Sequence, residues 1–241
     1  MHTQNVSYED RGLALTGYLA RPDYPGIDRP GVLLCHQGMG LTEHTCERAR
    51  MVAELGYVAF ALDLYGEVAR SREDVTRLMG ALTRDPDLLG ARADAGVKVL
   101  KSLVDVDPSR LAAIGFCFGG GVVLELARLR NDLAAVVAFH PGLMDLPDQD
   151  DRPIQARVMV CAGHNDPLIP ASARERLIKL MSDHNADWQL LTFGQAGHAF
   201  TDTTVDAFGM EGFSYHRPTD VRSWSAMQAL LEESFHPVDQ A

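Results

Sequence analysis

The sequence predicts an α/β fold in which a mostly parallel central sheet is covered by helices on both faces. Short apolar runs rich in Val, Leu, Ala and Phe recur along the chain, and longer helix-like segments separate them. The chain has 241 residues, 46% of them hydrophobic, which is enough for one sizeable core and too few for two comfortable domains. We therefore expect a single domain over residues 1–241.

The strands are expected where the apolar runs occur. Residues 6–20 predict an antiparallel pair of edge strands that turns at Asp10, Arg11 and Gly12. Six buried strands are expected to follow, at residues 31–35, 57–62, 111–115, 134–139, 158–162 and 189–193.

Helices are expected in the segments between the buried strands. A helix over 42–55 should end at Gly56, because glycine takes the left-handed C-cap conformation at little cost. A helix over 71–82 begins with Ser-Arg-Glu-Asp, which resembles a capping box. The other expected helices are 86–104, 122–130 and 220–235. Residues 201–217 fit no regular element and follow His198 closely, so they are expected to cover the functional site.

The composition excludes several classes of partner. The chain carries 22 basic and 33 acidic residues, a net charge of −11, and this balance repels nucleic acid and anionic membrane surfaces. No apolar run reaches the roughly 18 to 20 residues that span a bilayer. The first twenty residues lack the basic start and apolar middle of a secretion signal. We expect a soluble, cytoplasmic protein with a small-molecule partner.

Four cysteines in a chain of this length do not make a disulfide framework, and none forms a Cys-x-x-Cys pair. Free thiols are the simpler interpretation. A zinc site built from Cys35, His36, His44 and Cys46 is an alternative, since all four are soft ligands. His44 and Cys46 stand two apart on a predicted helix and so do not share a face. We therefore predict no metal and no cofactor.

One cysteine lies in a pattern that suits a nucleophile. The strand at 111–115 runs into Gly-Phe-Cys-Phe-Gly, centred on Cys117, and a helix-like segment follows. This is the thiol form of the G-x-S-x-G nucleophile elbow, which needs small residues on both sides because the nucleophile holds a strained backbone. The alternative is a structural cysteine in a Gly-rich turn.

An acid and a histidine follow in the chain order that this elbow requires. Asp166 comes directly after the strand at 158–162, and His198 follows the strand at 189–193. The carboxyl ends of parallel strands meet at one sheet edge, so both side chains can reach Cys117. His164 competes with Asp166 for the functional role in its loop, and an Asp there is also typical of a structural loop cap.

From about residue 31 to residue 235 the chain resembles the dienelactone hydrolases of the α/β-hydrolase superfamily. The resemblance rests on LCHQGMG, LGYVAFALDLYG, GFCFGGG, GHNDPLIP, GHAF and RSWSAMQALL, taken in this order and spacing. It implies an α/β-hydrolase fold, with Cys117 as nucleophile, His198 as base and Asp166 as its orienting acid. It also implies an oxyanion hole made by the backbone N–H groups of Phe118 and Gly38.

Two positions differ from the family pattern. The family commonly carries Glu where this chain has Gln37, and a glutamine cannot accept the thiol proton. Family members that act on dienelactone carboxylates hold the acid with arginines. Arg72 matches one of them, whereas Asp202 stands at the second position with the opposite charge. Dienelactone itself is therefore not the expected substrate.

The acyl pocket is expected to be walled by Met39 and by Phe116 or Phe118 beside the nucleophile. Gln37, Arg72 and Asp202 are also expected to contact the substrate. Together these features predict a hydrolase that cleaves a small ester or lactone through a Cys-His-Asp triad and an acyl-thioester. The alternatives are an esterase or thioesterase for unrelated acyl groups, and a weakly active member of the fold that binds a ligand. The oligomeric state is left open.

Overall fold

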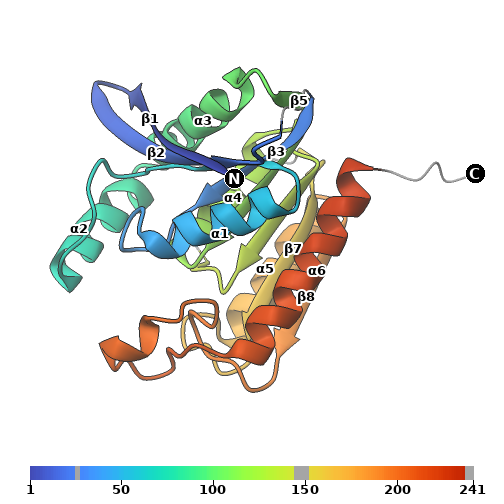
Figure 1. Cartoon of the computed structure of the whole chain (residues 1–241). Coiled ribbons are helices and arrows are strands. Elements are labelled where there is room, and N and C mark those ends of the chain that lie inside the picture. The colour runs from blue at the N-terminus through green and yellow to red at the C-terminus, as the bar shows by residue number, and fades with distance from the viewer. Residues whose placement is uncertain (25–27, 144–151, 237–241) are drawn as a thin grey trace, which may run out of the picture.

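A computed structural model describes residues 1–24, 28–143 and 152–236 of the chain. Its centre is an eight-stranded sheet with the strand order β1-β2-β4-β3-β5-β6-β7-β8 (Figure 1). The strands are β1 (His2–Asp10), β2 (Leu13–Arg21), β3 (Arg29–Cys35), β4 (Val58–Ala61), β5 (Val106–Phe116), β6 (Ala135–Phe139), β7 (Arg157–Gly163) and β8 (Trp188–Phe193). All pairs from β4 to β8 are parallel, and β1 and β2 are antiparallel additions.

Helices cover both faces of the sheet. They are α1 (Glu43–Glu54), α2 (Arg72–Thr83), α3 (Pro86–Ser102), α4 (Phe118–Leu129), α5 (Ala171–Asp183) and α6 (Arg217–Phe235), with a 3₁₀ turn at Val205–Phe208. Helices α1 and α6 pack on one face, and α2, α3, α4 and α5 contribute to the core on the other. None of the described helices has the length and apolar character needed to cross a membrane.

The mostly parallel sheet and the six strands predicted after the opening pair are confirmed, although β8 lies at the sheet edge and is partly exposed. The opening pair also forms and turns at Arg11 and Gly12, but only β1 lies at the sheet edge, because β2 pairs with β4. The prediction of two edge strands was therefore wrong for β2. Helix α6 begins at Arg217 rather than at Asp220, and α5 was not predicted.

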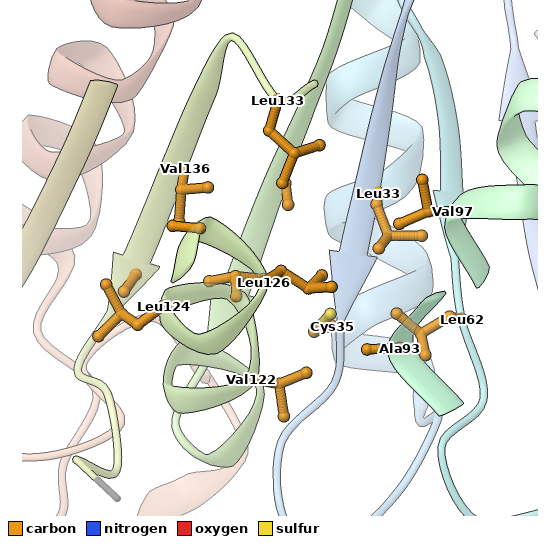
Figure 2. Packing of buried hydrophobic residues seen from close by; sticks show 14 of the residues in the cluster. Leu33, Cys35, Leu62, Ala93, Val97, Val122, Leu124, Leu126, Leu133 and Val136 are labelled. Carbon is orange, nitrogen blue, oxygen red and sulfur yellow. The ribbon is translucent and has the colours of Figure 1, made fainter. Parts of the chain in front are cut away.

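The core has two layers, one on each face of the sheet. Figure 2 shows the first layer, where Ala93 and Val97 of α3 and Leu126 of α4 pack near Leu33 and Val136 of the sheet. The strands between the layers are buried on both faces, which explains their nearly continuous apolar sequences. This double cover makes the sheet a rigid support for the loops at its edge.

Local sequence signals set the helix ends that lie near these loops. The hydroxyl oxygen of Ser71 accepts a hydrogen bond from the N–H of Asp74 at 3.1 Å, as the predicted capping box requires. After α1, Gly56 adopts a φ of +98°, the left-handed conformation expected of it. Helix α2 packs against the loop after β3, where a Cβ placed on Gly38 would lie 2.9 Å from the sulfur of Met79.

Candidate active site

Cys117 occupies a strained turn between β5 and α4, with φ 51° and ψ −115°. The turn brings backbone segments so close that side chains cannot enter. A Cβ on Gly115 would lie 2.0 Å from the carbonyl oxygen of Gly119, and one on Gly119 would lie 2.2 Å from that of Cys35. The turn is fixed by a hydrogen bond of 3.0 Å from the N–H of Cys117 to Phe139. A left-handed non-glycine residue costs about 1–3 kcal/mol, so this conformation is held by its surroundings.

Asp166 and His198 meet next to this turn. The Nδ1–H of His198 donates to Oδ2 of Asp166 at 2.8 Å, and both side chains are completely buried. The other carboxylate oxygen of Asp166 accepts the N–H of Leu168 at 2.8 Å. With Nδ1 engaged, the Nε2 atom of His198 has no nitrogen or oxygen partner among the described residues. This arrangement leaves Nε2 available to the thiol of Cys117.

The thiol and the imidazole change one another's proton affinity. Burial disfavours the thiolate of Cys117, but the charge and hydrogen bond of His198 and the backbone N–H groups of Phe118 and Gly38 together outweigh burial, and the pKa of the thiol lies below its ordinary value. Burial likewise disfavours the imidazolium of His198, yet Cys117 and Asp166 raise its pKa above the usual range. These opposite shifts favour a thiolate beside an imidazolium as the resting pair.

Two backbone N–H groups converge on the sulfur. They belong to Phe118, the first residue of α4, and to Gly38 in the loop after β3, and both help to lower the pKa of the thiol. The first is also the positive end of the α4 dipole, which favours negative charge. These are the two groups that the resemblance implied for an oxyanion hole, and the structure brings them together beside Cys117.

His36 holds the second of these groups in place, a role that the sequence did not reveal. Its Nδ1–H donates to the carbonyl oxygen of Gln37 at 2.7 Å, and its Nε2 accepts the N–H of Leu64 at 3.1 Å. The ring is completely buried, and burial lowers its pKa, so it stays neutral with one donor and one acceptor nitrogen. It thus ties the loop after β3 to the segment after β4.

Gln37 and Asp202 lie beside the site and are bound to each other. The side-chain amide of Gln37 donates to Oδ2 of Asp202 at 2.9 Å. The other carboxylate oxygen accepts the N–H and hydroxyl of Thr204 at 2.8 and 2.7 Å. Burial opposes ionisation of Asp202, but the bonds from Thr204 and Gln37 prevail and lower its pKa. Both side chains, expected to contact substrate, are thus occupied with protein partners.

The other predicted contact residues separate into two groups. Met39 and Phe118 pack in the same core layer next to the loop after β3. Phe116 does not wall a pocket, because its ring is fully buried in the opposite layer and stacks on Phe139 at 5.1 Å; that prediction was wrong. Arg72 is exposed at the first position of α2, and its side chain makes no hydrogen bond or ion pair with the described residues.

A buried polar cluster lies behind His198. The hydroxyl of Thr201 bridges the Nε2 atoms of His140 at 2.8 Å and His44 at 3.1 Å. The guanidinium of Arg48 donates to the carbonyl oxygen of Thr201 and pairs with Asp220 at 2.9 Å, which joins α1 to α6. The cluster anchors the segment after His198.

That segment also pairs with the histidine itself. The N–H of His198 donates to the carbonyl oxygen of Gly212, and the N–H of Ser214 donates to that of His198. The ring of Phe213 lies 4.6 Å from the His198 ring. Residues 201–216 therefore cover the histidine, in keeping with the expectation for this segment (orange in Figure 1). In the parts of the chain that the structure describes, no three His, Cys, Asp or Glu side chains are arranged to hold a metal.

Comparisons with known proteins relate the chain to dienelactone hydrolases. A model of the dienelactone hydrolase family matches residues 15–235. A solved dienelactone hydrolase-like promiscuous phosphotriesterase, P91 from metagenomic libraries, is 35% identical with a TM-score of 0.94 and covers 97% of this chain and 98% of its own. A Yersinia pestis protein provisionally named carboxymethylenebutenolidase is 28% identical over 94% of this chain and 86% of its own. A Bradyrhizobium protein provisionally named 2-oxo-3-(5-oxofuran-2-ylidene)propanoate lactonase is 27% identical over 84% of this chain and 86% of its own.

Proposed function

Since the chain belongs to the dienelactone hydrolase family, with the α/β-hydrolase fold that the sequence predicted, we propose that it hydrolyses a small ester or lactone through an acyl-thioester on Cys117. The observation that carries the proposal is the alignment of three groups around one sulfur. The imidazole of His198 is oriented by Asp166 at 2.8 Å, and two backbone N–H groups face the same sulfur.

The first half of the reaction forms the thioester. The thiolate of Cys117 attacks the carbonyl carbon, a C–S bond forms, and the π electron pair moves to the carbonyl oxygen. The N–H groups of Phe118 and Gly38 stabilise this oxyanion. When the oxyanion collapses, the ester C–O bond breaks, and the departing alkoxide takes the proton held on Nε2 of His198.

The second half regenerates the enzyme. The neutral imidazole of His198 takes a proton from water, which attacks the thioester carbonyl carbon, and a second oxyanion forms in the same place. Its collapse breaks the C–S bond, releases the acid and returns the thiolate beside the imidazolium. Asp166 remains ionised throughout and keeps Nδ1–H pointing toward itself.

Hydrolysis of an activated phenyl ester, measured with and without iodoacetamide, tests the proposal. We expect the alkylator to abolish turnover, and Cys117→Ala to lose activity by at least about 10³-fold, since no nucleophile remains. The matched control is Cys46→Ala, which removes another partly exposed thiol and should leave turnover intact. Full activity in Cys117→Ala would overturn the proposal, and an inactive wild type that still binds lactones would favour the ligand-binding alternative.

A phosphotriester is a second candidate substrate, favoured by the 35% identity and 0.94 TM-score to a promiscuous phosphotriesterase. The same thiolate would attack phosphorus and expel an aryloxide, while the two N–H groups would face the phosphoryl oxygen. A diethyl aryl phosphate assay separates the two candidates. Release of the phenol from the phosphate by wild type and not by Cys117→Ala supports this second activity.

A further inference from the structure

Tyr65 lies between the two segments that supply the N–H groups. It follows β4, and its ring stacks on that of Phe118 at 6.0 Å with an interplanar angle of 28°. Its other neighbours belong to the loop after β3. The ring meets His36 edge-on at 4.8 Å, and a Cβ on Gly40 would lie 3.5 Å from Cδ2 of Tyr65. The phenol therefore stands on the oxyanion side of Cys117.

The hydroxyl of Tyr65 is buried and has no hydrogen-bond partner within the described parts of the chain. The residue as a whole is only 6% exposed. Other buried phenols in this protein are satisfied: Tyr8 donates to the carbonyl oxygen of Asp63 at 2.7 Å, and Tyr57 reaches the carboxylate of Glu232 at 3.5 Å. Leaving a buried hydroxyl unpaired costs about 1–3 kcal/mol, which calls for an explanation in function.

The surroundings keep this hydroxyl protonated. Burial raises the pKa of Tyr65, and the negative charges of Cys117 and Asp63 raise it further. The phenol is therefore a hydrogen-bond donor at every working pH. It responds to the charge of Cys117 without any hydrogen bond to it. A buried donor that is unpaired at rest, on a ring that packs against Phe118, is suited to hydrogen-bond an atom that arrives with the substrate.

We propose that the Tyr65 hydroxyl is a third donor of the oxyanion hole, beside the N–H groups of Phe118 and Gly38. The inference rests on the proposed hydrolase function. As the C–S bond forms and the π pair moves to oxygen, the phenol donates a hydrogen bond to that oxygen and keeps its own proton. The third donor also contributes to specificity, because only substrates that develop negative charge on the carbonyl oxygen gain its hydrogen bond.

Tyr65→Phe tests this, because phenylalanine keeps the ring that stacks on Phe118 and removes only the hydroxyl. The matched control is Tyr57→Phe, a phenol of similar burial, 7% exposed, whose hydroxyl reaches Glu232 in the opposite core layer. Each preparation is titrated with iodoacetamide so that rates refer to reactive thiols, which corrects for any unfolded fraction. Three quantities are compared: kcat/KM for a phenyl ester, the inhibition constant of an aryl trifluoromethyl ketone, and the alkylation rate.

For Tyr65→Phe we expect kcat/KM to fall by about 10- to 100-fold, somewhat less than the loss seen when one of two donors is removed. The trifluoromethyl ketone, which forms a tetrahedral oxyanion on the thiol, should lose affinity by a similar factor. The alkylation rate should not change, because alkylation builds no charge on a carbonyl oxygen. Tyr57→Phe should match wild type in all three measurements.

Equal ester turnover in Tyr65→Phe and wild type would overturn the inference and leave the hydrolase proposal standing. A parallel fall in the alkylation rate would also overturn it, since the hydroxyl would then act on the thiol rather than on the acyl oxygen. A wild type without thiol-dependent turnover would instead overturn the hydrolase proposal on which the inference rests.

Discussion

At the scale of single residues, the four cysteines differ because their surroundings differ. Cys35 and Cys161 are completely buried, and burial raises the pKa of both thiols, that of Cys161 to about 12. Burial also raises the pKa of the partly exposed Cys46 to about 11. Only Cys117 has a lowered pKa, through His198. The reactivity of this thiol is a property of its site.

Selective alkylation should therefore distinguish Cys117 from the other three cysteines. Brief iodoacetamide treatment near pH 7, followed by peptide mapping, is expected to label Cys117 at least about tenfold faster than Cys46, since the thiolate is the reacting form. His198→Gln should slow the labelling of Cys117 and leave Cys46 unchanged. Equal labelling of the two thiols in wild type would show that no thiolate is present at rest.

We expect a carboxylate at position 37 to change the pKa of the Cys117 thiol. Gln37→Glu would replace the amide that donates to Asp202 with a second carboxylate. Repulsion between the two carboxylates should turn the new side chain toward Cys117 and raise the pKa of the thiol by about one unit. The ultraviolet absorbance of the thiolate, followed between about pH 5 and 9, measures the shift.

The double variant Gln37→Glu with Asp202→Asn is the control for this experiment. An asparagine at 202 can donate to the glutamate and hold it away from the sulfur, so the thiol pKa should return toward that of wild type. A thiol pKa that stays unchanged in Gln37→Glu alone would show that the side chain at position 37 does not reach the thiol.

Sequence reasoning identified the chemical types at the site but not their supporting contacts. Cys117, Asp166 and His198 could be predicted to meet because chain order and strand ends place them at one edge of the sheet. The position of Phe116 could not be read, since a strand buried on both faces lacks the alternation that tells one face from the other. Tyr65 was missed because an unpaired hydroxyl is visible only when all neighbours are known.

At the scale of elements, the turn between β5 and α4 depends on glycine. Gly119→Ala would place a methyl group 2.2 Å from the backbone oxygen of Cys35, which cannot move without distorting the sheet. We expect a loss of about 2–4 kcal/mol in the free energy of unfolding and a large fall in ester turnover. Urea denaturation measures the first, and the phenyl ester assay measures the second.

Gly194→Ala is the matched control for the turn. Gly194 follows β8, and a Cβ there meets nothing within 4 Å. An alanine at this position should leave the free energy of unfolding unchanged or raise it by less than about 1 kcal/mol, because it restricts the unfolded chain. If Gly119→Ala were equally well tolerated, the close approach of α4 to β3 would not be essential for the turn.

Elements with strong local signals were predicted well, and those stabilised mainly by distant contacts were not. The buried strands and the start of α2 follow from apolar runs and a capping box. Helix α5 was missed because only a narrow stripe of it is buried, through Ala173, Leu177 and Met181. Residues 201–216 are shaped by backbone hydrogen bonds to His198 and Phe200, which no local pattern encodes.

At the scale of the whole molecule, stability should fall in mild acid. Burial lowers the pKa of His36, His44 and His140, that of His44 to about 4. In the unfolded chain these histidines take up protons below about pH 6.5. Their contribution to the free energy of unfolding is therefore complete above pH 6.5 and declines as the pH falls toward the pKa in the folded protein. In that window each histidine should lower the free energy of unfolding by about 1.4 kcal/mol per pH unit. Urea denaturation at pH 7.5, 6 and 5 measures the decrease.

His44→Gln should reduce this slope by about 1.4 kcal/mol per pH unit, since glutamine can still donate to Thr201 but does not titrate. The control is His2→Gln, because His2 is exposed and should leave the slope unchanged. The Cys117 and His198 pair adds little near neutrality. Above about pH 6.5 one proton resides on the imidazole in the folded pair and on the thiol in the unfolded chain, so the number bound is the same; below that pH the unfolded imidazole also takes up a proton, and the pair adds to the slope. A slope that is flat down to pH 5 would contradict the prediction.

The order of the strands along the chain has a consequence for biosynthesis. Cys117 follows β5, whereas Asp166 follows β7 and His198 follows β8. A ribosome therefore releases the cysteine well before the two residues that turn it into a thiolate. Until β8 is added to the sheet, the nascent chain carries an ordinary, protonated thiol that reacts slowly with oxidants and electrophiles. The reactive form exists only once synthesis of the sheet is finished, and the topology thereby protects the growing polypeptide from its own chemistry.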